Sequence, residues 1–210
     1  MNRTGERSYR KLLWALVLLG ITLDQTTKYG VFKWLYNEGR GGDFVLIPGV
    51  FKLIAQFGNE PAPRDGVLAS LRTISGPTLP KVNHGALFGL GSDYITLANL
   101  IFATVSVAAA LAIVYWSSRP ATARDPALCT ALGLILAGTL GNLYDRLVFN
   151  GVRDFLYFHW FEFPVFNVAD CCLVCGAFLL LAQAFLHRPV ATPQQTDVAL
   201  VGARAGAANR

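Results

Sequence analysis

Long apolar blocks without a charged residue alternate with short charged stretches along this chain of 210 residues. The clearest block, residues 95–116, runs for 22 residues without a charge. As a helix it would be about 33 Å long, enough to cross the hydrocarbon core of a bilayer. Charged residues make up only 15% of the chain and apolar residues 53%, whereas average soluble domains carry about 25% charged residues. The pattern therefore predicts an α-helical integral membrane protein.

Four transmembrane helices are predicted, at about residues 10–28, 95–116, 127–145 and 165–186. For the first, a cleavable signal peptide is the alternative, because a basic segment precedes its apolar run. That run ends in a polar DQTTK stretch with no small-residue cleavage site. This favours a transmembrane helix that continues past Asp24.

The basic residues indicate how the helices are oriented. Residues 1–11 carry four Lys or Arg, and the short loop 117–126 carries two. Short cytoplasmic loops are enriched in Lys and Arg, so we expect an even number of spans with the N and C termini in the cytoplasm. The net charge of +5 is thus explained by topology, and we expect no nucleic-acid partner.

Between the first and second spans, residues 29–93 are predicted to form a small extracytoplasmic region. Two β-prone runs flank a Pro-Gly pair in 43–57, which predicts a hairpin. Residues 58–80 look loop-like apart from a short helix at 67–74. Residues 188–210 are predicted to be a disordered cytoplasmic tail. We expect residues 1–187 to form a single membrane-embedded domain.

Cysteine and histidine offer no obvious chemistry. All four cysteines lie in apolar segments, where a thiol usually acts as a small hydrophobe, and no cluster suggests a metal site. They are Cys129, Cys171, Cys172 and Cys175.

Four aspartates fall near the outer ends of the predicted spans: Asp24, Asp145, Asp154 and Asp170. A carboxylate within a membrane costs about 2.5–3.5 kcal/mol on insertion scales, so several on one side suggest a polar site between helices. Two neighbouring carboxyl groups cannot both ionise cheaply, and one keeps its proton. Such a pair can activate water and protonate a departing amine. The residues alone do not select Asp154 over Asp145 as a member of the pair. One hint is that Arg146 directly follows Asp145 on the same helix, which suggests that Arg146 holds Asp145 in its ionised form.

Other interpretations of these acids remain open. Asp24 and Lys28 lie four residues apart on one helix face, a spacing that also suits a simple interfacial ion pair. Polar residues also stabilise helix packing in a non-catalytic assembly protein. A small proton- or ion-coupled transporter is the main alternative function, although a relay needs groups through the whole bilayer and these acids gather on one side.

Five sequence blocks, taken together, identify the chain as similar to lipoprotein signal peptidase (signal peptidase II), a bacterial inner-membrane aspartic protease family. In order they are DQTTK (24–28), NHGALFG (83–89), GNLYDR (141–146), VRDF (152–155) and FNVAD (166–170). The resemblance implies that Asp154 and Asp170 are the catalytic pair. It implies that eight further residues line or brace the site: Asp24, Lys28, Asn83, Gly85, Asn142, Asp145, Arg146 and Asn167.

The resemblance also implies a substrate and a location. Members of the family remove the signal peptide of a prolipoprotein by cleaving before a cysteine modified with diacylglyceryl. The site would lie at the outer face of the inner membrane, in contact with membrane lipid, with no metal or cofactor. We expect the protein to act as a monomer.

Two features depart from the usual family pattern. Residues 58–80 look like an insertion, with no predicted function. Arg153 directly precedes Asp154, where an apolar residue is commoner. Neighbouring side chains on an extended segment point to opposite sides, so we expect Arg153 to face away from the catalytic pair. If it did not, it would lower the pKa of Asp154.

Overall fold

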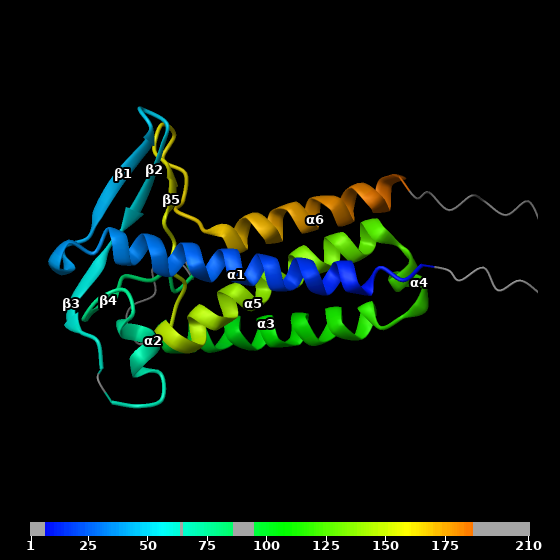
Figure 1. Cartoon of the computed structure of the whole chain (residues 1–210), viewed down its shortest axis with the longest axis horizontal. Coiled ribbons are helices and arrows are strands. Elements are labelled where there is room, and N and C mark those ends of the chain that lie inside the picture. Colours follow the sequence, from blue (N-terminus) through cyan, green and yellow to red (C-terminus); the bar gives the residue numbers. More distant parts are fainter. Residues whose placement is uncertain (1–6, 64, 86–94, 187–210) are drawn as a thin grey trace, which may run out of the picture.

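Four long helices lie side by side in the computed structural model, which describes residues 7–63, 65–85 and 95–186 (Figure 1). They are α1 (Arg10–Trp34), α3 (Ile95–Ser117), α5 (Pro126–Phe149) and α6 (Val168–Leu186). Within the described ranges, α3, α5 and α6 are long and apolar enough to cross a membrane. Helix α1 begins and α6 ends at one end of the bundle, and two small sheets lie at the other (Figure 1).

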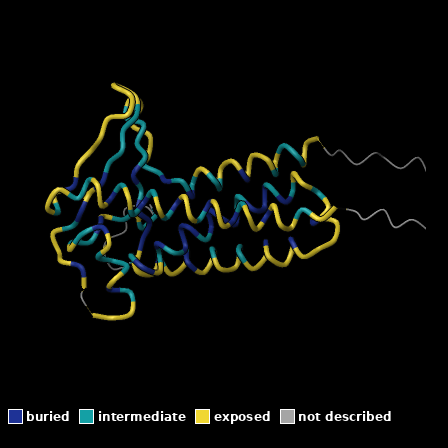
Figure 2. The backbone as a smooth tube through the Cα atoms, viewed as in Figure 1, coloured by how far each residue is buried: buried dark blue, intermediate teal, exposed yellow. Residues whose placement is uncertain are grey.

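Helix α5 is the centre of the bundle and packs against the other three long helices. Small residues allow this close approach. A Cβ atom added at Gly138 would lie 2.3 Å from the carbonyl oxygen of Ala169 in α6. Figure 2 shows the contrast in burial: α5 is largely buried, whereas the outward faces of α3 and α6 are exposed along their length. The exposed side chains there are mostly apolar, as a lipid-facing surface requires.

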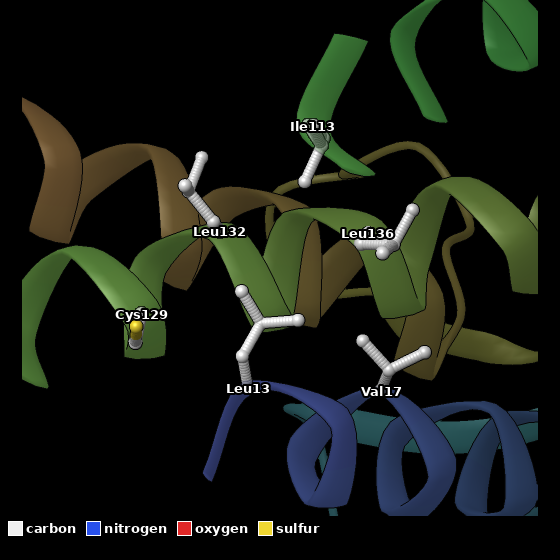
Figure 3. Close-up of a cluster of buried hydrophobic side chains, with 6 residues drawn as sticks. All are labelled: Leu13, Val17, Ile113, Cys129, Leu132 and Leu136. Atoms are coloured by element: carbon white, nitrogen blue, oxygen red, sulfur yellow. The ribbon is translucent and has the colours of Figure 1, made fainter. Parts of the chain in front are cut away.

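The apolar core at the far end of the bundle joins α1, α3 and α5 (Figure 3). Its buried members are Leu13, Val17, Ile113, Cys129, Leu132 and Leu136. The core is therefore well packed on the side opposite the sheets.

Helix α1 presents a single buried stripe to the bundle, with members three or four residues apart. They are Leu13, Val17, Gly20, Asp24, Lys28 and Phe32. The prediction that Asp24 and Lys28 share a face is confirmed, and that face points inward. The helix continues to Trp34, beyond the predicted end near residue 28.

A three-stranded antiparallel sheet is built on the predicted hairpin. Strands β1 (Gly42–Ile47) and β2 (Phe51–Ala55) pair around a turn in which Gly49 has a φ of 75°. This confirms the hairpin. A third strand, β5 (Leu156–Phe158), pairs with β2 from the aromatic loop. It was not predicted.

The prediction of a mostly loop-like segment at 58–80 is wrong. Strand β3 (Phe57–Pro61) pairs antiparallel with β4 (Thr78–Pro80) in a second sheet. Between them lies the short helix α2 (Ala69–Thr73), inside the predicted 67–74 helix. This second sheet was missed because β3 and β4 are short and β3 contains Gly58 and Pro61, so the strands form only through mutual pairing.

Several boundaries differ from the sequence prediction. Helix α5 extends to Phe149 and ends at Asn150 in a left-handed conformation with φ 59°, so Asp145 lies inside the helix. Helix α6 begins at Val168, three residues later than predicted. The chain also forms two short turns of helix, η1 (Asn37–Gly39) and α4 (Pro120–Arg124). The predicted tail at 188–210 and residues 86–89 of the second block lie outside the described residues.

Candidate active site

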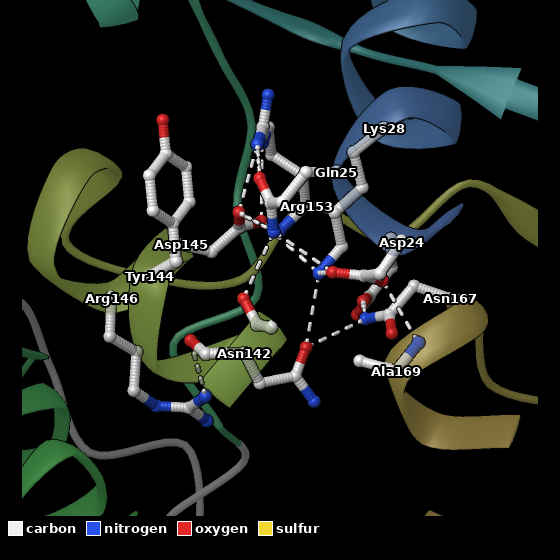
Figure 4. Close-up of polar contacts among 12 residues, drawn as sticks. Asp24, Gln25, Lys28, Asn142, Tyr144, Asp145, Arg146, Arg153, Asn167 and Ala169 are labelled. Carbon is white, nitrogen blue, oxygen red and sulfur yellow. Dashed lines mark hydrogen bonds and ion pairs between the residues drawn. The ribbon is translucent and has the colours of Figure 1, made fainter. Parts of the chain in front are cut away.

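Polar side chains from α1, α5, α6 and the 151–167 loop meet at the end of the bundle next to the sheets (Figure 4). Asn83, from the segment after β4, joins them. They form two adjoining groups. The dyad cluster comprises Asp154 and Asp170 with Asn83, Asn142 and Asn167. The ionic cluster comprises Asp24, Gln25, Lys28, Asp145 and Arg153.

Asn167 joins the two carboxyl groups of the dyad cluster. Its side-chain amide donates to Asp154 Oδ1 at 2.7 Å, and its backbone N–H donates to Asp170 Oδ2 at 3.2 Å. In return, its Oδ1 accepts from the backbone N–H of Asp170 at 3.0 Å. This reciprocal pair caps the first turn of α6. The same residue that starts the helix therefore holds both acids.

Two further asparagines complete the cluster. The Asn142 amide donates to Asp170 Oδ1 at 2.9 Å, and the Asn83 amide donates to Asp154 Oδ2 at 2.9 Å. Each acid thus receives hydrogen bonds from neutral amides.

Gly85 sets the orientation of Asn83. Its backbone N–H donates to Asn83 Oδ1 at 2.9 Å, which leaves the Asn83 amide free to face Asp154. Gly85 has a φ of +81°, and a Cβ atom there would lie 2.4 Å from the Phe102 ring. Glycine is therefore needed at this position both for conformation and for space.

Burial raises the pKa of Asp154 from 3.8 to about 6. The hydrogen bonds from Asn83 and Asn167 favour the ionised form and oppose this shift, while the nearby charge of Asp170 adds to it. A carboxyl group with this pKa exchanges its proton close to neutrality, which suits a general acid.

The ionic cluster lies beside the dyad cluster and is built differently. The Lys28 ammonium contacts Asp24 at 2.9 Å and Asp145 at 3.5 Å. The Arg153 guanidinium donates to both Asp145 oxygens, at 2.8 and 3.2 Å. All four charged side chains have an exposed fraction of 0%. Two acidic and two basic side chains, none of them exposed at the surface, thus balance each other's charge.

Asp24 also reaches α6, where Ala169 donates its backbone N–H to Oδ1 at 2.9 Å. The two clusters meet at Asn142 Oδ1, which accepts from Lys28 at 3.1 Å and from Asn167 at 3.2 Å. The ionic cluster therefore ties α1, α5 and α6 together directly behind the two acids.

The structure thus brings together all ten residues named from the sequence: eight lie in the two clusters, and Gly85 and Arg146 are each hydrogen-bonded to a cluster member. Arg146 is attached through a backbone carbonyl. Its guanidinium lies 5.1 Å from the Phe102 ring centre and donates to the Asn142 carbonyl at 3.4 Å. It lines a cavity of about 310 Å³ together with Asn142 and Asp170.

The sequence suggested that Arg146 holds Asp145, because the two are neighbours. That inference is wrong, since Arg153 and Lys28 hold Asp145 instead. Arg153 does turn away from Asp154, as expected from the extended backbone. The role of Gln25, which accepts from Arg153 at 2.9 Å, was missed. Its signal was a polar residue between Asp24 and Lys28 at the end of an apolar run.

Both acids border open space. Asp154 lines a cavity of about 370 Å³ with Gln56, Lys81 and Asn83. Asp170 lines a second, apolar cavity of about 520 Å³ with Phe163, Phe166, Cys171, Val174 and other residues. The two cavities lie beside the two acids, so the site can receive a polar chain and an apolar group at once.

Among the described residues, no three His, Cys, Asp or Glu side chains are placed to share a metal ion.

Comparisons with known proteins agree with this arrangement. Residues 78–186 match the family described as signal peptidase (SPase) II. The lipoprotein signal peptidase of Rhodopirellula baltica is 35% identical over 189 residues, covering 83% of this chain and 71% of the relative. That of Pseudomonas fluorescens is 30% identical over 190 residues, covering 88% and 92%.

Two solved structures share the fold. Both are described as bacterial membrane enzymes, with TM-scores of 0.64 and 0.65 at 21% and 22% identity. They cover 91% and 89% of this chain, and 98% and 100% of their own chains. This chain therefore has the same arrangement of helices and small sheets as these two structures.

Proposed function

The chain belongs to the signal peptidase II family, and we propose that it removes the signal peptide from prolipoproteins by cleaving before a diacylglyceryl-modified cysteine. The family match covers more than half of the chain, and the lipoprotein signal peptidase of Pseudomonas fluorescens aligns with nearly all of it. Nothing in these matches favours the transporter alternative. The protein is a multi-pass membrane protease.

We assign the aspartic type of chemistry to Asp154 and Asp170. The observation that carries this assignment is the bridge made by Asn167, whose two N–H groups reach one oxygen of each acid. Such a bridge holds two carboxyl groups around one substrate position. The ionic cluster has no comparable access, because its acids are fully buried and face cations.

The proton balance follows from the two environments. In the active form Asp154, with its raised pKa, holds a proton and acts as the acid, while Asp170 acts as the base. A water gives a proton to Asp170 as its oxygen bonds to the scissile carbonyl carbon, and Asp154 protonates the carbonyl oxygen. The tetrahedral intermediate then collapses. The C–N bond breaks, the amine takes the proton held by Asp170, and Asp154 recovers its own.

For the membrane arrangement, we propose four spans, with α1 as the fourth beside α3, α5 and α6. The basic start of α1 favours a cytoplasmic N terminus, and α6 ends on the same side (Figure 1). The dyad cluster then lies at the outer face of the inner membrane. Residues 1–187 would form one domain, followed by a cytoplasmic tail at 188–210.

The cavities suggest how substrate binds. An extended peptide would bind in the cavity of about 370 Å³ beside Asp154. Lipid chains would bind in the apolar cavity of about 520 Å³ beside Asp170. A substrate with both parts would be held across the two acids. We propose that the protein acts as a monomer, because the residues of one chain complete both clusters.

Cleavage of a lipidated prolipoprotein by the purified full chain tests the assignment. We expect Asp154→Asn and Asp170→Asn each to abolish cleavage while the protein still inserts and folds, because Asn has the same size and shape as Asp but cannot exchange the proton. The exposed Asp43→Asn serves as the matched control with normal activity. Full activity in either dyad variant would disprove the assignment. An unlipidated substrate, assayed in parallel, tests whether the lipid is required.

A further inference from the structure

Arg153 is the largest side chain that is completely buried in the described part of the chain. Its guanidinium packs against two aromatic rings, 4.0 Å from the centre of Tyr29 and 4.1 Å from that of Phe149. Stacking against aromatic faces restricts a guanidinium strongly, because the planar group has few alternative positions. Arg153 is therefore held rigidly between α1 and α5.

Most hydrogen bonds of Arg153 go to Asp145. Its side chain binds both oxygens of Asp145, and its NH2 group also donates to Gln25 Oε1 at 2.9 Å. Its backbone N–H donates to the same Asp145 carboxylate at 2.8 Å. The Asp145 carboxylate thus binds both the backbone N–H and the guanidinium of Arg153. Any movement of the guanidinium would be transmitted to the backbone at position 153.

That backbone leads directly into Asp154. The preceding residue, Val152, exchanges backbone hydrogen bonds with Asn83 at 2.7 and 2.9 Å. Asp154 binds the side chains of Asn83 and Asn167. The segment 152–154 is therefore bound to Asn83 through Val152 and Asp154, and to the ionic cluster through Arg153.

We propose that Arg153 is a positioning residue, which fixes the backbone of 152–154 so that the carboxyl group of Asp154 is aimed at Asn167 and Asp170. This inference rests on the proposed role of Asp154 in catalysis. The guanidinium acts through geometry, because its charge is already matched by Asp145 and it contacts no atom of the dyad cluster.

The decisive variant is Arg153→Lys, which keeps the positive charge but loses the bidentate hydrogen bonding of the guanidinium. An ammonium cannot bind both Asp145 oxygens and Gln25 in the same geometry. We expect kcat to fall about tenfold or more, since a displacement near 1 Å can cost about 100-fold in rate. KM should change by less than about twofold, and the pH midpoint of kcat/KM should stay in place. The exposed Arg40→Lys is the matched control and should match the unmodified protein.

A second pair of variants separates position from charge balance. Arg153→Met leaves Asp145 with one cation fewer, and Asp145→Asn/Arg153→Met removes one acid and one base together. We expect the double variant to have a higher Tm than Arg153→Met, because its cluster is neutral again, but to keep a low kcat. All rates are referred to folded protein and measured well below each Tm.

Three results would overturn the inference: an unchanged kcat in Arg153→Lys, a shifted pH midpoint in that variant, or recovery of kcat in the double variant. Asp154→Asn in the same assay keeps the two proposals apart. If it is inactive while Arg153→Lys is fully active, only the positioning role fails. If it is active, the assignment of the catalytic pair fails first.

Discussion

Two pairs of aspartates lie next to each other in this protein, and their partners differ in kind. Asp24 and Asp145 in the ionic cluster each contact a cation and have no exposed surface. Asp154 and Asp170 in the dyad cluster receive hydrogen bonds from asparagine amides and backbone N–H groups, and both border cavities.

The difference shows how one residue type serves two purposes within a few ångströms. A cation beside a buried carboxylate compensates its charge and locks its position. An amide supplies the hydrogen bond without the charge, so the acid can still gain or lose a proton. Only the second arrangement is suited to acid–base chemistry, and the first provides the rigid support behind it.

The largest effect on stability should come from breaking the ionic cluster. Asp145→Asn leaves Arg153 and Lys28 with one acid fewer, and loss of one partner of a buried ion pair costs about 3–5 kcal/mol. We expect a marked decrease in Tm in detergent micelles. Asp43→Asn, which removes an exposed pair with Lys52 at 3.1 Å, should cost at most about 1 kcal/mol. Similar Tm values for the two variants would show that the ionic cluster is not the support we describe.

The contrast between the clusters also explains what the sequence could predict. Long apolar runs specify helices locally, so the positions of α3, α5 and α6 were close to those found. The helix spacing of Asp24 and Lys28 likewise predicted a shared face. These features depend on residues near in sequence, where periodicity is informative.

Features that depend on distant partners were missed. Strand β5 forms because Phe51 of β2 packs against Phe158, with ring centres 4.6 Å apart, and no local pattern signals this pairing. Arg146 was expected to hold Asp145 because it is adjacent in sequence. On a helix, neighbours point about 100° apart, so Arg146 faces Phe102 and an arginine from the following loop takes its place.

The pH dependence of cleavage should reflect the dyad cluster alone. The active form needs a protonated Asp154, whose pKa is raised to about 6. We therefore expect kcat/KM to fall above a midpoint near pH 6, approaching tenfold per pH unit, because this parameter reports groups of the free enzyme. Asn83→Ala removes a hydrogen bond that favours the ionised form, and should move the midpoint upward. A flat profile between pH 5 and 8 would contradict the assignment of Asp154 as the acid.

The smallest expected effect is a gain in stability. The pKa of Asp154 is raised in the folded protein to about 6 from an ordinary value of 3.8. The folded state therefore binds more protons between these values, and stability falls as the pH rises from about 4 to about 6. Above that range, the ionised side chain costs about 1–3 kcal/mol of folding free energy. Asp154→Asn removes this cost.

We accordingly expect Asp154→Asn to raise Tm at pH 7.5 and to have little effect at pH 4, as measured by thermal unfolding in micelles. Asp145→Asn should lower Tm at pH 7.5, so the same chemical change would have opposite signs in the two clusters. A lower Tm for Asp154→Asn at pH 7.5 would mean that its carboxyl group stabilises the fold. The two clusters would then differ only in accessibility. A higher Tm combined with loss of cleavage would instead mean that the dyad cluster maintains a destabilising acid for its chemistry, with the ionic cluster holding it in place.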